Sequence, residues 1–346
     1  MLPEGYSARP AMLEDAAAVA AVIGLCQLAA FGAVEIDESE VRDDWAGVDM
    51  ASDTLVIERE GEPRAFADLV IRPGQVSVYG YVHPAETGRG LGSYLTAWGE
   101  QRALAEAAAS SEPIVVRHYV VSTNRAATRL LEERGYGFVR AVLWMERDLT
   151  GTTAGRSGGD HRATPPALPP GTSLRRYRGD SDEPAAHQAF EAGSLDMNGR
   201  APNSIEQWLA VAGTKDKDLF FIVEADGAPA AAGNGAIVGI LIASLRGPTG
   251  SAVAGGAQEG GDRVPAETAR GYVDSLRVVR EWRRRGIGAA LLSAAFAALK
   301  RRGAVTVGLS VDANSPTGAP SLYLRAGMHV TRRYLVMERT FGADGR

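Results

Sequence analysis

The sequence predicts a mixed α/β protein made of two similar halves. In each half, stretches with the alternation of a β-strand follow stretches with the periodicity of an α-helix. A short pattern also occurs twice: residues 82–95 read VHPAETGRGLGSYL and residues 278–291 read VVREWRRRGIGAAL. The pair Gly90/Gly92 thereby corresponds to Gly286/Gly288. Similarity between such distant segments indicates a duplicated domain rather than an array of short repeats.

The second half shows the order of elements most clearly. We expect a strand at residues 271–279 and a helix at 286–302, whose apolar positions recur with helical spacing and which ends at Gly303. A strand at 305–311, a short helix at 319–325 and a closing strand at 330–340 follow. The first half matches, with strands at 76–82, 113–121 and 139–147 and helices at 91–107 and 126–134.

Two segments rich in Gly, Pro, Thr and Ala lack any apolar period. Residues 150–171 are typical of an interdomain linker. Residues 247–269 indicate a long loop, which is uncommon inside a compact domain and is either functional or disordered. We therefore expect an N-terminal domain at 1–150, a linker at 151–171 and a C-terminal domain at 172–346.

Composition excludes several classes of protein. The 346 residues are 45% hydrophobic and 23% charged, as in ordinary folded proteins, and the net charge of −5 argues against general nucleic-acid binding. No run of 18 apolar residues predicts a membrane span, and the first residues do not resemble a secretory signal. The five histidines lack metal-ligand spacing, so no metal is expected. The single Cys26 cannot form an internal disulfide, which fits the cytoplasm; its apolar helical surroundings indicate a buried structural thiol.

The segment Arg283-Arg284-Arg285-Gly286-Ile287-Gly288-Ala289 predicts an anion site at the start of a helix. Glycines in the first helical turn each cost up to about 1 kcal/mol relative to alanine. Arginines at that end also face the positive pole of the helix dipole. A bound pyrophosphate accounts for both features, because small residues let the anion reach the free N–H groups. No Gly-Lys-Ser/Thr follows, so this is not a P-loop, and the third glycine of the dinucleotide fingerprint is replaced by Leu291.

This order of strand, arginine-glycine turn, helix, strand, Asn, and helix with Leu-Tyr resembles the GNAT superfamily of acyl-CoA-dependent N-acetyltransferases. Arg283, Gly286 and Gly288 match the superfamily's turn motif, and Asn314 and Leu322-Tyr323 match its downstream signature. The first half keeps Gly90, Gly92 and Asn124 but has Thr87 and Leu131 at the other positions. Tandem chains of this kind resemble the actinobacterial mycothiol synthase-like group. The resemblance implies two domains, each a mostly antiparallel central sheet flanked by helices.

The resemblance also implies acetyl-CoA as co-substrate. The backbone of Leu276, Arg277 and Val278 would pair with the pantetheine arm, and the glycine turn would hold the pyrophosphate. Asn314 would bind the arm or cap a helix. The residues that the resemblance assigns to acetyl-CoA in the two halves are Leu276, Arg277, Val278, Arg283, Arg284, Arg285, Gly286, Ile287, Gly288, Ala289, Asn314, Val82, Arg89, Gly90, Leu91 and Gly92.

Tyr323 stands where the superfamily places its general acid, and a phenol held near the leaving thiolate can protonate it. Many members carry a glutamate base at the place of Tyr272. Asp274 lies two residues later and so on the same strand face; we interpret it as the base or the amine-binding carboxylate, with a structural role or a water chain as alternatives. The first half carries Val76 and Val78 at the corresponding positions.

These observations predict acetyl transfer to the primary amine of a small molecule by direct attack in a ternary complex, with catalysis in the C-terminal half. Two predicted helices, 185–198 and 203–211, carry the acceptor-pocket candidates Glu191, Asp196, Asn198, Glu206 and Trp208. No nucleic-acid or membrane partner is expected, and the protein would be a monomer or homodimer. The alternatives are a non-catalytic acyl-CoA-binding or regulatory protein and an enzyme that acetylates proteins.

Overall fold

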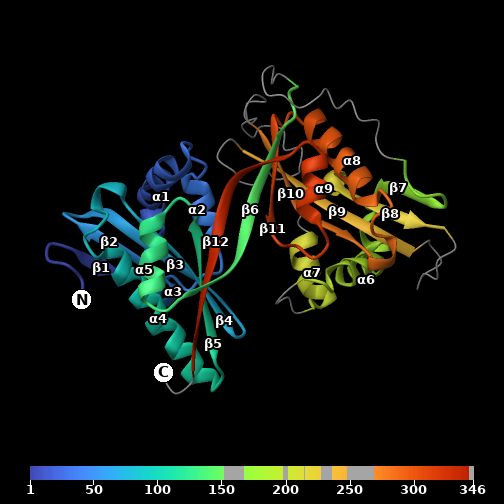
Figure 1. Ribbon diagram of the computed structural model, residues 1–346. Coiled ribbons are helices and arrows are strands. Elements are labelled where there is room, and N and C mark those ends of the chain that lie inside the picture. Colours follow the sequence, from blue (N-terminus) through green and yellow to red (C-terminus); the bar gives the residue numbers. More distant parts are fainter. Residues whose placement is uncertain (152–166, 198–201, 214, 227–235, 248–268, 343–346) are drawn as a thin grey trace. The chain divides into compact units, whose positions relative to one another are not determined.

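The computed structural model describes residues 1–151, 167–197, 202–213, 215–226, 236–247 and 269–342 (Figure 1). The chain divides into two compact units. The N-terminal unit comprises Met1–Leu143 and Arg332–Arg346, and the C-terminal unit comprises Trp144–Pro248 and Ala252–Thr331, each as far as it is described. The segments expected to be the linker and the long internal loop lie almost wholly outside the described residues.

The sheet of the N-terminal unit has the strand order β1-β2-β3-β4-β5-β12. Its neighbouring strands are antiparallel except for the parallel pair β4 and β5. The elements are β1 (Ser7–Arg9), α1 (Ala16–Phe31), α2 (Glu38–Asp44), α3 (Met50–Asp53), β2 (Thr54–Arg59), β3 (Glu62–Arg72), β4 (Gln75–Val82), α4 (Leu91–Ser110), β5 (Ile114–Val121), α5 (Arg125–Glu133) and β12 (His329–Phe341).

The C-terminal unit repeats this plan with the order β6-β11-β10-β9-β8-β7, in which β10 and β11 form the parallel pair. Its elements are the end of β6 (Gly137–Asp148), β7 (Thr172–Arg176), α6 (Glu183–Ser194), α7 (Ile205–Ala212), β8 (Phe220–Ala225), β9 (Ala236–Arg246), β10 (Arg270–Val278), α8 (Ile287–Arg301), β11 (Thr306–Asp312) and α9 (Ala319–Arg325). Residues 137–143 of β6 belong to the N-terminal unit, and residues 329–331 of β12 belong to the C-terminal unit. The predicted fold class, a duplicated mixed α/β domain with a mostly antiparallel sheet, is confirmed.

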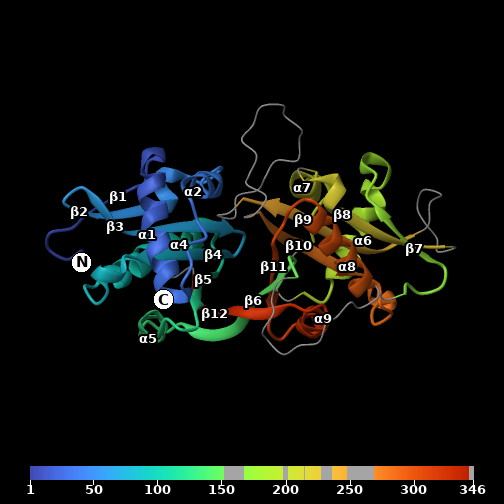
Figure 2. The ribbon, with the colours of Figure 1, turned by 90° about the horizontal axis from the view of Figure 1, so that it is seen from above.

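Helices cover both faces of each sheet (Figures 1 and 2). In the N-terminal unit, α1 packs over Val56 and Phe66, whereas α4 packs over Leu69 and Val78 on the opposite face. In the C-terminal unit, α6 and α7 cover one face of β8 and β9. The helix α8 approaches the other face so closely that a Cβ on Gly239 would lie 2.7 Å from Ile287. Each unit therefore has a core on either side of its sheet.

The last strand of each sequence half completes the sheet of the other unit. Strand β12 pairs antiparallel with β5 from Tyr334↔Val121 to Phe341↔Ile114, whereas β6 lies beside β11. Just after β6, the N–H of Leu149 donates to the carbonyl of Val305 at 2.8 Å. Because of this exchange, no single cut in the sequence separates the two units, and the domain limits at 150 and 172 stay predictions.

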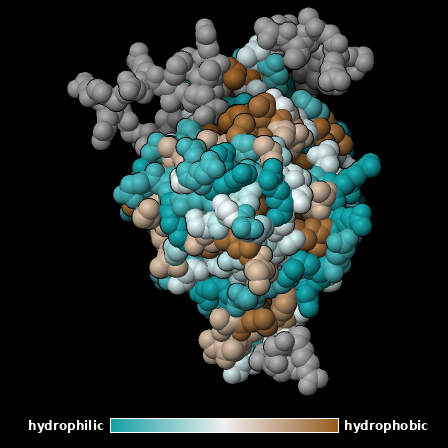
Figure 3. All heavy atoms as spheres, turned by 90° about the vertical axis from the view of Figure 1, so that its left-hand side faces the viewer, coloured by the Kyte–Doolittle hydropathy of each residue, from teal (hydrophilic) through white to brown (hydrophobic). Residues whose placement is uncertain are grey.

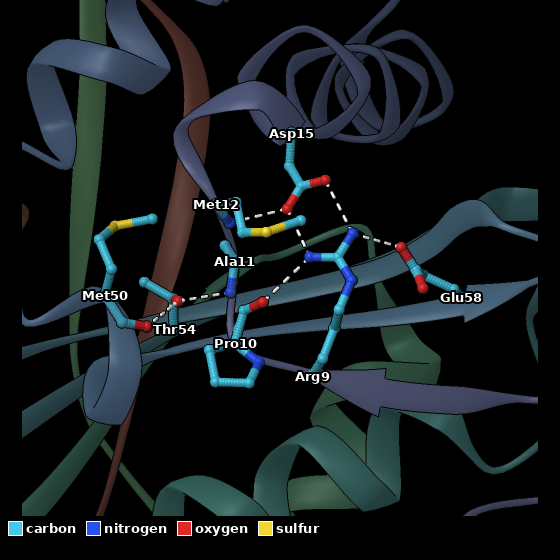
Figure 4. A network of polar contacts seen from close by, with 8 residues as sticks. All are labelled: Arg9, Pro10, Ala11, Met12, Asp15, Met50, Thr54 and Glu58. Carbon is cyan, nitrogen blue, oxygen red and sulfur yellow. Dashed lines mark hydrogen bonds and ion pairs between the residues drawn. The ribbon is translucent and has the colours of Figure 1, made fainter.

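Each unit contains an equivalent, partly buried arginine network that the sequence analysis did not identify. In the N-terminal unit, the guanidinium of Arg9 bonds both carboxylate oxygens of Asp15, at 2.6 and 2.8 Å, and also Glu58 (Figure 4). In the C-terminal unit, Arg175 bonds Asp182 in the same bidentate way, at 2.6 and 2.7 Å, and also Glu224. In both units the network ties the first strand to its neighbour and to the turn before the first helix, which supports the duplication.

The face of the molecule in Figure 3 is mainly hydrophilic, with separate apolar patches.

Residues Leu13–Phe31, which include α1, are apolar and long enough to cross a membrane by length and composition alone. The core helix of a soluble protein passes the same test, and Val19 and Ile23 of this helix pack into the core of the N-terminal unit.

Candidate functional site

The parallel strand pair opens in each unit. Strands β4 and β5 are paired only from Gln75↔Val115 to Val78↔His118, and β10 and β11 only from Arg270↔Thr306 to Tyr272↔Gly308. Beyond these pairs the strands separate, so each unit contains a wedge with unpaired backbone along its sides. A backbone edge of this kind can pair with an extended ligand.

A turn of the same geometry follows β4 and β10. Gly88 and Arg284 have φ values of +83° and +60°, and the helix N-caps Gly90 and Gly286 have +85° and +88°. The left-handed conformation costs a non-glycine residue such as Arg284 about 1 kcal/mol. No side chain caps α4 or α8, so the first N–H groups of each helix lack partners of that kind. The two turns can therefore each bind an anion through the backbone.

The turn's arginines differ in their surroundings. The guanidinium of Arg283 bonds the carbonyl of Val278 at 2.9 Å, the carbonyl of Gly193 at 3.2 Å, and Asp196. Arg285 is exposed and stacks over Trp282 at 5.1 Å. Its counterpart Arg89 is 53% exposed and pairs with Glu86 at 2.9 Å. The side chain of Arg283 is thus held by bonds to other parts of the protein, whereas those of Arg285 and Arg89 lie on the surface of the two turns.

The second glycine of each turn lets the following helix approach closely. A Cβ on Gly288 would lie 3.0 Å from Leu322, and one on Gly92 would lie 3.3 Å from Leu130. Leu322 and Leu130 are therefore equivalent, and so are the next residues, Tyr323 and Leu131, as the sequence predicts. In the asparagine turn the equivalence differs by one residue. The N–H of Asn124 donates to the backbone carbonyl of Val121, whereas the N–H that donates to the backbone carbonyl of Asp312 is that of Ser315 and not that of Asn314.

The two asparagines also differ in their contacts. Asn124 caps α5 by accepting from the N–H of Ala127 at 3.1 Å. Asn314 is exposed, and its own N–H donates to the Asp312 carboxylate at 2.8 Å.

Tyr323 lies on α9 and is only 8% exposed. Burial raises the pKa of its phenol to about 12, and the nearby Arg277 acts against this shift. The phenol therefore carries its proton at all ordinary pH values. Arg277 itself donates to the carbonyl of Leu276 at 2.9 Å and to the hydroxyl of Ser194 at 3.0 Å. Arginine side chains thus bond the backbone carbonyls of both Leu276 and Val278. A pantetheine arm lying along β10 would therefore pair with backbone N–H groups of the strand, or it would displace the side chain of Arg277.

Asp274 lies at an irregularity of β10, where the register with β9 shifts between Val273 and Ser275. Its Oδ1 lies 3.4 Å from Lys215 and 3.6 Å from Arg246, whereas its Oδ2 is buried without a hydrogen-bond partner. Arg246 also lies 3.9 Å above the ring of Tyr272, so Tyr272 and Asp274 face the same side, as expected. One carboxylate oxygen therefore lies beside two cations, and the other is buried without a hydrogen-bond partner.

The remaining candidates for the acceptor pocket lie in different surroundings. Trp208 is 3% exposed and belongs to the core, and Asp196 forms ion pairs with Arg283 and Arg280. Glu191 lies on α6 and Glu206 in the first turn of α7. Asn198 lies outside the described residues.

A family model of the acetyltransferase (GNAT) family matches residues 22–138 and again residues 190–328. The chain belongs to the GNAT acetyltransferase family. A GCN5-related N-acetyltransferase from Sphaerobacter thermophilus is similar over 98% of this chain and 97% of its own, with 33% identity and a TM-score of 0.79.

Two more distant solved structures share the fold of this GNAT protein. A tandem GNAT protein from the clavulanic acid biosynthesis pathway is 14% identical, with 97% and 98% of the two chains covered and a TM-score of 0.66. An acetyltransferase structure from Pyrococcus horikoshii is 12% identical, with 100% and 93% covered and a TM-score of 0.53. No curated protein sequence matches the chain significantly.

The N-terminal GNAT unit contains a cavity of about 400 Å³ in its wedge. The cavity reaches from the turn, at Thr87 and Gly92, through the opening between β4 and β5 to α1 and β12. Side chains that line it and that sequence reasoning did not connect with a site are Phe31, Tyr79, Tyr81, His118, Tyr119 and Tyr334. The sequence did contain a signal for His118. In a strand at residues 113–121, side chains alternate between the two faces, so His118 lies on the same buried face as Val116 and Val120.

Cys26 also lines this cavity and is half-buried. Its thiol donates to the carbonyl of Val82 at 3.1 Å. Burial raises the pKa of the thiol to about 11, so little thiolate is present at neutral pH. This environment suits a hydrogen-bonding thiol and not a nucleophile.

Proposed function

We propose that the protein is an acetyl-CoA-dependent N-acetyltransferase that acts on the primary amine of a small molecule, with catalysis in the C-terminal unit. The observation that carries the choice of unit is Tyr323, a buried phenol next to the wedge, where the N-terminal unit has the apolar Leu131. Membership of the GNAT family supports acyl-CoA as the donor. A cysteinyl conjugate of the mycothiol type, an amino sugar, an aminoglycoside and an amino acid are the acceptors to test.

The proposed reaction is direct attack within a ternary complex. Acetyl-CoA would bind with its pyrophosphate on the turn at Gly286–Gly288 and its pantetheine arm along Leu276–Val278. The carboxylate of Asp274 would bind the incoming ammonium and take its proton, directly or through water. The amine nitrogen then attacks the thioester carbon, the C–S bond breaks, and the phenol of Tyr323 protonates the leaving sulfur. The products are the N-acetyl amine and CoA.

Asp274→Asn tests the carboxylate. The amide keeps the size of the side chain but can neither attract nor deprotonate an ammonium, so we expect turnover to fall about 100-fold or more with unchanged acetyl-CoA binding. Steady-state kinetics with calorimetric binding measure both. The matched control is Asp218→Asn, on the exposed pair with Arg176. Full turnover by Asp274→Asn would assign the proton transfer to water instead.

We also propose that both turns bind acyl-CoA, which charge reversal at equivalent exposed positions tests. A carboxylate in Arg89→Glu or Arg285→Glu would lie beside the bound pyrophosphate and repel it. Calorimetry should find two acetyl-CoA molecules per wild-type chain and one per single variant, with turnover lost only in Arg285→Glu. One molecule per wild-type chain, abolished by Arg285→Glu alone, would contradict binding by the N-terminal unit.

A non-catalytic acyl-CoA-binding protein is the second candidate, because Tyr272 stands where many members of the family carry a glutamate base. Tight acetyl-CoA binding without turnover of any amine in the panel would favour it. For either function we propose a cytoplasmic location, since a chain with a single cysteine has no internal disulfide, as is usual for proteins of a reducing compartment.

A further inference from the structure

The cavity of the N-terminal unit passes through the sheet from one face to the other. On β4, Val78 belongs to the core beneath α4, whereas Tyr81 packs against the core beneath α1. Because side chains alternate along a strand, Tyr79 shares the α1 face with Tyr81. On β5, Val120 belongs to the α4 core, so Tyr119 also lies on the α1 face. All five residues line the cavity, which therefore has an α4 side, next to the turn, and an α1 side.

The α1 side is lined by aromatic rings from one helix and three strands. We call these five residues the aromatic wall: Phe31 of α1, Tyr79 and Tyr81 of β4, Tyr119 of β5 and Tyr334 of β12. Each of the five is half-buried, so a molecule in the cavity can reach part of each side chain. Tyr79 and Tyr119 follow the last pair of β4 and β5, and their rings are parallel within 5°, with centroids 5.6 Å apart.

The lining of the cavity carries no fixed charge. Among the described residues, no Asp, Glu, Lys or Arg side chain lines it. Burial raises the pKa of Tyr79 to about 12 and that of Cys26 to about 11, and it lowers the pKa of His118 to about 4, so these three groups are neutral at pH 7. An ion in this cavity would lose water without gaining a charged partner, which is unfavourable. The cavity therefore favours an uncharged ligand.

Charged groups beside the aromatic wall do not change this preference. The guanidinium of Arg332, which lies 4.0 Å above the ring of Phe31, bonds both carboxylate oxygens of Glu35. Asp68 lies opposite Tyr79 on β3, but it does not line the cavity, and burial raises the pKa of its carboxyl to about 7. The first charge is thus matched within the protein, and the second is partly removed by protonation at neutral pH.

We propose that the α1 side of this cavity binds an uncharged aromatic molecule, held by the rings of the aromatic wall. Pairs of aromatic rings are favourable at centroid distances of about 4.5–7 Å, and a ligand ring can join the parallel pair of Tyr79 and Tyr119 in this way. The proposed function places acyl-CoA at the turn, on the α4 side. The aromatic molecule binds on the other face of the sheet, so this inference goes beyond the proposed function and does not require bound acyl-CoA.

The test compares four probes of similar size by ligand-observed NMR titration of the full chain. The probes are 2-phenylethanol, its saturated analogue 2-cyclohexylethanol, the ammonium 2-phenylethylamine and the carboxylate phenylacetate. We expect 2-phenylethanol to bind about tenfold more tightly than 2-cyclohexylethanol, the effect of one or two ring pairs. It should also bind about tenfold more tightly than either ion, because the cavity cannot compensate a charge.

Three variants assign the preference to the aromatic wall. Tyr79→Leu removes one ring of the parallel pair and should reduce the ratio of phenylethanol to cyclohexylethanol affinity to about two or less. Tyr79→Phe keeps the ring and should keep the ratio, so that loss of the hydroxyl alone is excluded as the cause. Tyr334→Leu repeats the test on β12 if Tyr79→Leu does not fold.

The matched control is Tyr94→Leu. Tyr94 is a half-buried tyrosine of the same unit that packs against the core around Leu91 and Leu95, and it does not line the cavity. This variant should bind all four probes as the wild type does.

The outcomes separate this inference from the proposed function. The absence of binding of any probe, equal affinity for 2-phenylethanol and 2-cyclohexylethanol, or tightest binding of 2-phenylethylamine overturns the inference. A ratio that persists in both leucine variants overturns it as well. The Arg89→Glu chain should lose acetyl-CoA from the N-terminal turn and still prefer 2-phenylethanol. If acetyl-CoA never binds the N-terminal unit while this preference remains, the proposed N-terminal acyl-CoA site is wrong and the inference stands.

Discussion

Replacing Tyr323 with phenylalanine is expected to lower the rate of acetyl transfer by about two to four orders of magnitude, the usual contribution of a general acid. The loss should appear in kcat, with acetyl-CoA affinity nearly unchanged, because phenylalanine fills the same buried space. Mass spectrometry of the acetylated amine across the acceptor panel measures the effect. Tyr177→Phe, a buried tyrosine of the core of the same unit, is the matched control and should keep wild-type turnover.

The pH dependence of the activity tests the protonation state of the Tyr323 phenol. Its pKa is raised to about 12 by burial, so the acid form persists well above neutral pH. Wild-type activity should therefore not fall through loss of this proton as the pH rises from about 8 to about 10, although an unperturbed tyrosine titrates near 10. An alkaline decline with a pKa near 10 that is absent from Tyr323→Phe would contradict a buried, high-pKa acid.

Replacing Arg332 with leucine is expected to destabilise the N-terminal unit by about 3 kcal/mol, because it removes the arginine's charge from beside a largely buried carboxylate. Arg332 lies on the exchanged strand β12 and forms a two-point ion pair with Glu35; their side chains are only 8% and 14% exposed. Its guanidinium also lies 4.0 Å above the ring of Phe31. The pair thus holds the C-terminal strand to the end of α1.

Denaturant unfolding, followed by hydrogen exchange of the β12 amides, measures this effect. The double variant Glu35→Leu/Arg332→Leu should recover part of the lost stability, since it removes both charges. Arg129→Leu is the control, because its pair with Glu133 is 81% and 60% exposed and such surface pairs contribute little. Equal unfolding curves for Arg332→Leu and Arg129→Leu would mean that β12 is not held by this pair.

The sequence predicted the fold class, the duplication and the elements from β4 to β6 and from β10 to β12, because these depend on local patterns. The strands β1 to β3 and β7 to β9 were not predicted. The helix 319–325 was placed residue for residue at Ala319–Arg325, and the strand expected at 113–121 is Ile114–Val121. The two turns were also predicted. Gly90 and Gly286 have left-handed backbone, which favours glycine, and the glycines can be recognised in the sequence.

Only the tertiary structure decided which residues meet. Arg332 lies 297 positions from Glu35, and no local pattern predicts that the last strand completes the first sheet. The same exchange brings Tyr334 to a cavity otherwise lined by residues 26–131, and the divergence of β4 from β5 leaves His118 beside open space. The local sequence determines where strands, helices and turns form, because those depend on backbone conformation and period. Which strand pairs with which, and which buried polar atom stays unpaired, depends on packing between distant segments.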